Sequence, residues 1–388
     1  MNILIIQHFG GIGGGARSAI DVAQMLKNLN HNVDLMVGDV TNDYLSLIKE
    51  KGLNLILDHP EFPIFNFHNA SGSVLKTIYR FISTKKFIKD WNDYIKINWK
   101  YDLVILNSSV LCPLVEIFQK SQIKSIVFIR ETFRKNYILN NIEKNYLRKA
   151  DAVVYLTNFD KNAWNCGMNQ FVIPDVIDSE MFPLVSLQPI QDSVKLLYLG
   201  GLNFYKGALD LLKALYELKE KRFNYELYIL GNLYEEYDNF SFLRKCISIK
   251  HIKYRKDCIN YINKINKDYK RIKLVGIVKD VTKYYRISNV IIFPVKKVHQ
   301  PRPVYEAGYY GRTVVIPNYD NFNESIINGY NGYTYKKNNI ESFEKSLIEV
   351  FSNPDEVVKR GQANKKLTID NHSFANAIPI LEAILKKI

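Results

Sequence analysis

The chain has few residues of the kinds that build covalent or metal-bound frameworks. Its 388 residues include four cysteines, and none stands in C-x-x-C spacing. We therefore expect neither a disulfide framework nor a zinc site. No apolar run approaches the ~18 residues that a membrane-spanning helix needs, and the first residues lack the basic segment of a signal peptide. These absences predict a cytoplasmic protein.

Charge and composition narrow the class of protein. The hydrophobic content of 47% is that of a globular chain, and 388 residues suit two domains. The formal net charge is +14, which two interpretations explain. It is either a bias of composition, or it serves a phosphate-bearing partner such as a nucleotide sugar, a lipid phosphate or an anionic membrane. Motifs for nucleic-acid binding are missing, so we expect no nucleic acid partner.

Apolar strand-like runs alternate with helical patterns from the first residue onward. This is the βαβ rhythm of a doubly wound α/β sheet. It stops at a stretch rich in Pro, Ser and Gln and then restarts, so we expect two domains, 1–185 and 186–370, and a C-terminal helix within 371–388. The expected strands cover 3–6, 33–37, 53–57, 103–106, 125–129 and 152–156 in the first set, and 196–199, 226–230, 272–275, 290–293 and 314–316 in the second.

Three short motifs in the second half have the residue types of a phosphate and ribose pocket. A glycine turn ending at Gly201 precedes Lys206 at the mouth of an expected helix. Arg302 and Glu306 stand four apart, so they share a face if that stretch is helical. Glu324 comes shortly before a further glycine turn. Lysines and helix N-termini hold phosphates and carboxylates accept sugar hydroxyls, so the motifs predict a pocket for a diphosphate joined to a ribose.

The order and spacing of these motifs resemble the donor half of the GT-B glycosyltransferases, and most closely glycosyltransferase family 4. That family carries G-R-L-x-x-x-K-G, E-x7-E and a later acid before a glycine turn. The first half agrees, because Gly14-Gly15-Ala16 opens a helix that runs to His31-Asn32-Val33, and 173–178 resembles the family's hinge strand. The resemblance implies two Rossmann-like doubly wound domains facing a central cleft. Domain 1–185 would bind the acceptor, 186–370 the nucleotide sugar, and the last helix would cross back to the first domain.

Two positions depart from the family pattern. The arginine after the first glycine is Gly201 here, and the first glutamate of E-x7-E falls at Val298. We expect His299 and Arg302 to take over part of both roles. The resemblance assigns catalytic roles to Lys206, Arg302 and Glu306, and donor contacts to Gly14, Gly201, Lys206, His299, Arg302, Glu306 and Glu324.

Each of these residues also has a structural interpretation. Lys206 can be a solubilising surface lysine, and Arg302 with Glu306 a surface ion pair. His299 can be an ordinary loop histidine, and Glu324 a carboxylate at a helix N-terminus. Both interpretations stay open for each residue.

Two local features around Arg302 and Glu306 carry further expectations. Pro301 and Pro303 should stiffen the backbone of Arg302 and limit local helix. Ala307 and Gly308 should let a ligand approach the backbone beside Glu306.

The glycine loop near the N-terminus permits three interpretations. Gly11, Gly13 and Ala16 satisfy the dinucleotide fingerprint G-x-G-x-x-A, but polyglycine meets that pattern easily. The loop is a structural turn, or the cofactor site of an NAD-dependent enzyme, or, in a GT-B fold, a source of backbone N–H groups for the donor phosphate or the acceptor. The NAD interpretation leaves the motifs of the second half unexplained.

The acceptor side offers fewer candidates. The family often has a histidine followed by glutamate at the end of a mid-domain strand, and Arg130-Glu131 stands there. His8 and Gly13, beside the glycine loop, complete the acceptor-side candidates. Residues 76–100 are basic and aromatic, and either form a solvated helix or contact anionic lipid at the inner face of the membrane. A second basic stretch, 244–273, is expected to be a surface insertion.

These residues predict a retaining glycosyltransferase that moves a sugar from a nucleoside-diphosphate sugar to a saccharide or lipid-linked acceptor, in envelope polysaccharide or glycoconjugate synthesis. No D-x-D pair is present, so we expect no metal at the diphosphate and no cofactor beyond the sugar donor. The alternative is a catalytically inactive relative that binds a nucleotide or a partner, which Gly201 and Val298 favour.

Overall fold

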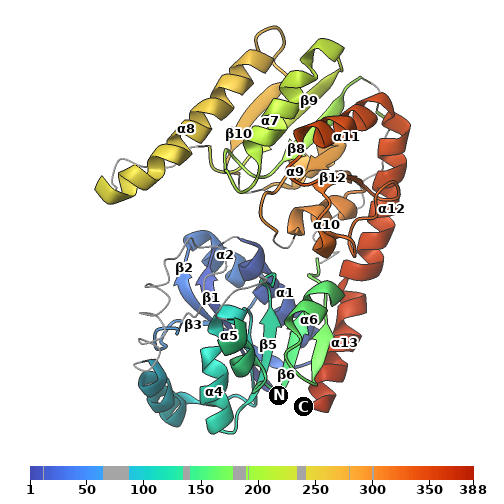
Figure 1. Cartoon of the computed structure of the whole chain (residues 1–388). Coiled ribbons are helices and arrows are strands. Elements are labelled where there is room, and N and C mark those ends of the chain that lie inside the picture. The colour runs from blue at the N-terminus through green and yellow to red at the C-terminus, as the bar shows by residue number, and fades with distance from the viewer. Residues whose placement is uncertain are drawn as a thin grey trace. The chain divides into compact units, whose positions relative to one another are not determined.

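The computed structural model describes residues 1–11, 13–63, 87–133, 140–177, 189–190, 192–233, 242–278, 280–298 and 301–388. The chain forms two compact units. Unit 1 comprises Met1–Asp178 and His372–Ile388, and unit 2 comprises Ser179–Asn371. The predicted domain boundary, near residue 185, lies a few residues beyond this division. Unit 2 is thus one continuous stretch of chain inserted into unit 1 (Figure 1).

Unit 1 is built on a parallel sheet whose described strands follow the order β3-β2-β1-β4-β5-β6-β7. The central strands contain unbroken apolar runs such as Leu103–Leu106 and Ala152–Tyr155, as expected where helices cover both faces of a sheet. The strands are β1 (Asn2–Gly10), β2 (Asn32–Val40), β3 (Asn54–Ile56), β4 (Leu103–Leu106), β5 (Lys124–Ile129), β6 (Ala152–Tyr155) and β7 (Gln170–Val172).

Side chains that alternate along these strands divide the core of unit 1 into two layers. On β1, Ile3 and Ile5 pack with one group of helices, and Leu4 and Ile6 pack on the opposite face. The C-terminal helix belongs to the first layer, where Leu381 is fully buried. The helices are α1 (Gly14–Asn28), α2 (Asn42–Glu50), η1 (Ser109–Leu111), α4 (Pro113–Lys120), α5 (Asn140–Leu147), α6 (Asn158–Trp164) and α13 (Phe374–Lys387).

Unit 2 is also built on a parallel sheet, whose described strands follow the order β10-β9-β8-β11-β12-β13. Its strands are β8 (Val194–Tyr198), β9 (Tyr225–Leu230), β10 (Ile272–Gly276), β11 (Val290–Ile292), β12 (Thr313–Pro317) and β13 (Tyr333–Tyr335). Its helices are α7 (Ala208–Glu217), η3 (Lys219–Lys221), α8 (Phe242–Ile265), α9 (Thr282–Ile287), α10 (Arg302–Tyr309), η4 (Asp320–Phe322), α11 (Ile340–Ser352) and α12 (Pro354–His372).

The α/β class with two doubly wound parallel sheets is confirmed, and every strand predicted in the two alternating sets is present. Two short strands, β7 and β13, were not predicted because their residues, Gln-Phe-Val and Tyr-Thr-Tyr, do not form an apolar run. The predicted hinge strand is wrong, because the residues from Ile173 to Ile177 lie beyond the end of β7 and form no strand. Among the described residues, no helix is both long and apolar enough to cross a membrane.

Candidate functional site

The glycine turn after β8 is built so tightly that it excludes any side chain. Gly201 has φ +56°, and its amide donates to the carbonyl of Leu230 at 2.7 Å. A Cβ on Gly201 would lie 2.2 Å from the carbonyl oxygen of Asn232. The arginine that the family carries at this position therefore does not fit this backbone, so its absence is a property of the turn and not a simple exchange of side chains.

The same turn fixes the position of Lys206. The Asn203 carboxamide accepts from the amides of Tyr205 and Lys206 at 2.8 and 3.2 Å. Gly207 then caps α7 with φ +79°, and a Cβ there would lie 1.8 Å from the carbonyl oxygen of Pro294. Lys206 consequently stands at the N-terminal end of α7, where the helix dipole favours anions.

The side chain of Lys206 is half-buried, and its ammonium group is partly desolvated. Burial lowers the pKa of Lys206 from 10.5 to about 8. Its Nζ lies 5.9 Å from the centre of the Phe293 ring. A solubilising surface lysine is not desolvated in this way, and an anion bound here would offset the cost of the buried charge.

Arg302 and Glu306 share one face of α10, as their spacing predicts. Arg302 Nε donates to Glu306 Oε1 at 3.2 Å, and the two side chains are only 12% and 9% exposed, so the ion pair is buried and not a surface pair. The Tyr285 hydroxyl donates to Glu306 Oε2 at 2.8 Å. A carboxylate has about four acceptor positions, so these two contacts alone do not exhaust it.

Two expectations about this helix are wrong. The prolines do not limit it, since α10 begins at Arg302 and Pro303 lies in the first turn, where no amide is needed for the helix. Gly308 does not make room for a ligand, because a Cβ there would lie 1.9 Å from Thr368 Oγ1 of α12. Ala307 is fully buried. Both small residues therefore allow close packing within unit 2.

The third motif, which contains Glu324, forms a loop that hydrogen bonds of Asn331 hold in place. Glu324 is exposed in the turn after η4, so it is not a carboxylate at a helix N-terminus. Asn331, fully buried, donates to the carbonyl of Ser325 at 2.9 Å and accepts from the amide of Ile327 at 2.7 Å. Asn331 was not recognised from sequence. His299 lies outside the described residues.

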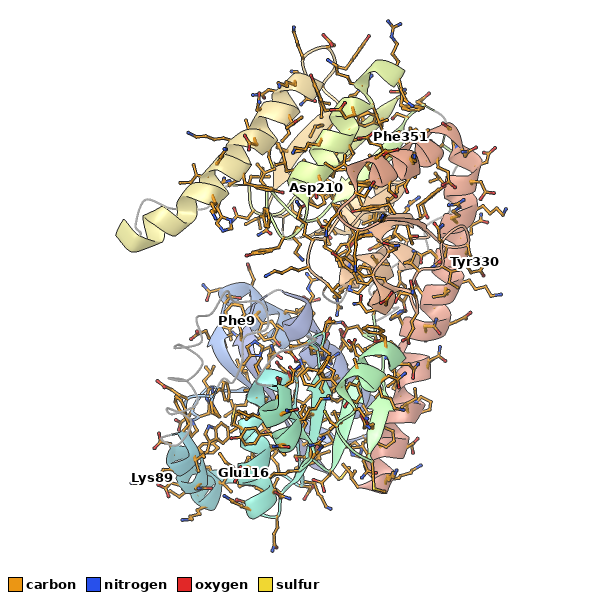
Figure 2. All side chains as sticks on the ribbon, viewed as in Figure 1. Phe9, Lys89, Glu116, Asp210, Tyr330 and Phe351 are labelled. Carbon is orange, nitrogen blue, oxygen red and sulfur yellow. The ribbon has the colours of Figure 1, made fainter. Side chains whose placement is uncertain are left out.

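The topology brings these segments to one edge of the unit 2 sheet. The turn that holds Lys206 follows β8, α10 follows β11, and the Glu324 loop follows β12, and these strands are parallel neighbours. Asp210 of α7, labelled in Figure 2, pairs with Lys296 at 3.0 Å and so links the segments after β8 and β11. The carboxyl ends of parallel strands are where doubly wound sheets bind ligands.

In unit 1 the glycine loop contains both tight and open positions. A Cβ on Gly10 would lie 2.8 Å from Val37 Cγ1, whereas one on Gly13 would meet no described atom within 4 Å. Gly13 is the N-cap of α1 and Gly14 is its first residue. Close packing therefore explains Gly10, but it does not explain why Gly13 is glycine.

Glu131 is held at the carboxyl end of β5. Its carboxylate accepts from the Ser108 hydroxyl and from the amides of Ser109 and Arg130, the amides at 3.0 and 3.1 Å. His8 is half-buried, and burial lowers the pKa of His8. The negative charge of the Glu131 carboxylate opposes that shift. His8 and Glu131 are therefore close enough to interact electrostatically.

Arg130 is part of a buried network that the sequence did not reveal. Its guanidinium donates to Asp175 Oδ1 at 2.7 Å and, through two nitrogens, to Asn107 Oδ1 at 3.1 and 2.8 Å. Asp175 also accepts from the Ser18 hydroxyl at 2.7 Å, and Asn107 donates to the Gly15 carbonyl at 2.8 Å. Arg130 thus fixes the start of α1 to the segment after β7.

The described part of the basic segment 76–100 packs as a solvated helix. Residues 87–98 are helical, and Trp91 is fully buried against Phe62 and Phe118. Lys89 is exposed (Figure 2). The tryptophan therefore serves the core, and a membrane contact through this stretch would have to use its lysines. Residues 76–86 lie outside the described part.

Comparison with known proteins agrees with this arrangement. Residues 186–367, nearly all of unit 2, match the family described as glycosyl transferases group 1. An uncharacterized glycosyltransferase of Haemophilus influenzae is 24% identical over 375 residues, which cover 94% of each chain. HepE of Anabaena, solved with UDP, matches with a TM-score of 0.76 at 13% identity, covering 100% of both chains. A glycosyltransferase of Rickettsia africae matches at 0.73 and 18%, covering 100% of this chain and 98% of that one.

The fold is therefore the GT-B fold of two Rossmann-like units, as the resemblance implied. The second unit thus matches the glycosyl transferases group 1 family, and a relative that spans most of the chain is likewise described as a glycosyltransferase. Among the described residues, no group of three or more His, Cys, Asp or Glu side chains could hold a metal ion.

Proposed function

We propose that the chain is a retaining glycosyltransferase that uses a UDP-sugar as donor. The observation that carries the proposal is Lys206, a desolvated cation held at the N-terminal end of α7 beside the carboxyl ends of the central strands. Such a preorganised charge stabilises a leaving diphosphate far better than a hydrated one does. HepE, which shares the fold, has been solved with UDP and with UDP-glucose, which supports uridine as the base.

In this proposal the chain supplies charge and position, not a nucleophile. Lys206 and Arg302 neutralise the diphosphate as the anomeric C–O bond breaks, and Glu306 accepts the ribose hydroxyls. Gly14, Gly201, His299 and Glu324 provide further donor contacts. The acceptor hydroxyl attacks from the face that the diphosphate leaves, and its proton passes to the leaving phosphate. The anomeric configuration is then retained, without a metal ion or a further cofactor.

We assign acceptor binding to unit 1 and donor binding to unit 2. Arg130, His8, Gly13 and Glu131 are the acceptor-side candidates, and the buried Arg130 also fixes the start of α1 next to Gly13. The acceptor is a saccharide or a lipid-linked saccharide of envelope polysaccharide or glycoconjugate synthesis. A cytoplasmic protein at the inner face of the membrane suits such an acceptor.

The product's anomeric proton tests the mechanism. NMR of the product formed from a UDP-hexose should show the donor's anomeric configuration, and activity should survive EDTA. An inverted linkage would contradict the retaining assignment. Activity lost to EDTA and restored by Mg²⁺ or Mn²⁺ would show that a metal balances the diphosphate charge.

Nucleotide binding and hydrolysis separate the enzyme from an inactive relative. Purified protein should slowly hydrolyse a UDP-hexose, and Lys206→Ala or Glu306→Ala should each weaken UDP binding by about 1–3 kcal/mol, the cost of a lost charged hydrogen bond. Arg302→Ala should lower kcat/KM more than Arg302→Lys, since lysine keeps the charge but loses the planar fork. UDP binding without any turnover would favour the inactive alternative.

A further inference from the structure

Unit 2 also contains a strongly basic pocket. It lies at the amino ends of the strands, whereas Lys206 lies beyond their carboxyl ends. It has a volume of about 700 Å³, within the range of ligand pockets. It forms where η3 leads into β9 and where α8 leads into β10. β9 and β10 are parallel neighbours, so their amino ends meet here, whereas Lys206 and Arg302 follow the carboxyl ends of β8 and β11. The pocket is therefore separate from the candidate donor site.

Positive charge dominates the lining. Its acidic residues are Glu226 and Asp268. Glu226 is already engaged, because its Oε2 accepts from Lys273 Nζ at 2.8 Å and from the Tyr228 hydroxyl at 2.7 Å. Asp268 alone is left to balance the cations. The cationic lining residues are Lys219, Arg222, Lys264, Lys270 and Arg271.

For most of these cations, the described side chains supply no counter-ion. Within the described part of the chain, no carboxylate lies at ion-pair distance from Arg222, Lys264, Lys270 or Arg271. Other surface lysines do pair with a glutamate one helical turn away, as Lys386 does at 2.6 Å. Unbalanced cations that converge on one pocket raise its positive potential and attract anions.

Arg271 is oriented by two aromatic rings. Its guanidinium carbon lies 5.2 Å from the ring centres of both Tyr225 and Tyr269. Tyr225 is almost fully buried, whereas Tyr269 is 68% exposed. Contacts with the two rings hold the guanidinium in place, and a guanidinium held in this way suits bidentate contact with phosphate. The exposed ring of Tyr269 offers an apolar face to the remainder of a ligand.

The loop that carries these residues is held by its own hydrogen bonds. Asn266 accepts from the amide of Ile272 and donates to its carbonyl, both at 2.9 Å. The amide of Arg271 donates to the carbonyl of Tyr269 at 2.8 Å, and the Arg271 carbonyl accepts from Leu227 at 2.8 Å. The loop is thereby preorganised, which reduces the entropic cost of binding.

We propose that this pocket binds a phosphate-bearing ligand, with Arg271 and Lys264 on the phosphate and Tyr269 against the rest of the molecule. The recognised chemistry is a phosphate ester, carried either by a soluble metabolite or by the headgroup of an acidic lipid. The proposal is independent of the donor chemistry, since none of the residues involved belongs to the donor site.

Calorimetric titration with inorganic pyrophosphate tests the pocket. The double variant Lys264→Ala/Arg271→Ala should weaken one class of sites about tenfold, equivalent to 1.4 kcal/mol. The matched control Lys345→Ala/Lys386→Ala removes two lysines that are paired on helices elsewhere, and it should bind as the unaltered protein does. Thermal unfolding of both proteins checks that they are folded, and Arg271→Lys, which keeps the charge, should bind with intermediate affinity.

Vesicle co-sedimentation separates the two sources of phosphate. Vesicles of phosphatidylglycerol with phosphatidylcholine are compared with phosphatidylcholine alone, for the unaltered protein and both double variants. Pyrophosphate binding that the pocket variant loses identifies a soluble ligand, and vesicle binding that it loses identifies a lipid headgroup. If neither assay distinguishes the pocket variant from its control, the proposal is overturned.

Discussion

Lys206 should affect both the stability of the folded protein and the proposed binding of UDP. Its pKa is lowered from 10.5 to about 8 by burial, so at pH 7 the native state carries a charge that the unfolded chain solvates better. Lys206→Met should therefore stabilise the protein at pH 7, by on the order of 1–3 kcal/mol, while it weakens UDP binding.

The pH dependence supplies a check on this prediction. Between pH 8 and 10.5 the unfolded chain holds the proton that native Lys206 has lost, so the stability of the unaltered protein rises across that window. The advantage of Lys206→Met should shrink over the same range in chemical denaturation. A variant less stable at pH 7 would mean that Lys206 is not held as a strained cation.

Gly201 allows a test of the family's missing arginine. Gly201→Arg should not restore a diphosphate cation, because φ +56° and the Asn232 carbonyl oxygen leave no space for a Cβ. We expect a loss of roughly 2–4 kcal/mol of stability, from left-handed backbone strain and overpacking. Calorimetry would show it as a lower Tm, and a stable, more active variant would contradict it.

The sequence predicted that Arg302 and Glu306 share one helix face, because that relation depends on local spacing alone. Residues four apart lie on one face of a helix, so Arg302 and Glu306 can form an ion pair once the segment is helical. The role of Gly308 was predicted wrongly. Close contact with Thr368 on another helix requires its small size, and the local sequence does not indicate that contact. Asn107 was missed for the same reason, since its partners Arg130 and Gly15 are distant in sequence.

At the scale of elements, substitutions in the glycine loop before α1 should distinguish glycines needed for packing from glycines needed for binding. Gly13→Ala should leave Tm nearly unchanged, because an added Cβ meets no described atom within 4 Å. If donor or acceptor occupies that space, kcat/KM should fall by about tenfold or more. Gly10→Ala is the matched control, and it should lower Tm, since its Cβ would crowd Val37. Full activity in Gly13→Ala would favour a merely structural loop.

The junction between α12 and α13 carries a buried histidine that responds to acid. His372 Nδ1 bonds to the carbonyl of Asp175 at 2.7 Å, and burial lowers the pKa of His372 from 6.5 to about 4. Between those values the unfolded chain binds a proton that the native state excludes, so stability falls as pH drops from 6.5 to 4. The loss attributable to His372 is about 3 kcal/mol at most.

His372→Gln should remove this part of the acid dependence. Denaturant melts at pH 7 and pH 4.5 would measure the slope, which matters more than the absolute stability because glutamine packs differently. His31, half-exposed at the surface, supplies the control His31→Gln, which should keep most of the slope. An unchanged slope in His372→Gln would contradict the assignment.

At the scale of the molecule, the two units should respond differently to ligand. If UDP binds unit 2, as proposed, saturation at 100 Kd adds about 2.7 kcal/mol to the unfolding of that unit. Scanning calorimetry with and without UDP should move one component of the transition more than the other. Uniform movement of a single transition would show instead that the units unfold together.

The position of α13 also has a consequence for synthesis. Its residues Ala377, Leu381 and Ile384 are buried in the core that begins with β1. A chain emerging from the ribosome thus delivers the first strands of unit 1 early and their covering helix last, with unit 2 in between. Unit 2 has its own core and can fold as soon as it emerges. Unit 1 therefore begins to emerge before unit 2 and is completed after it.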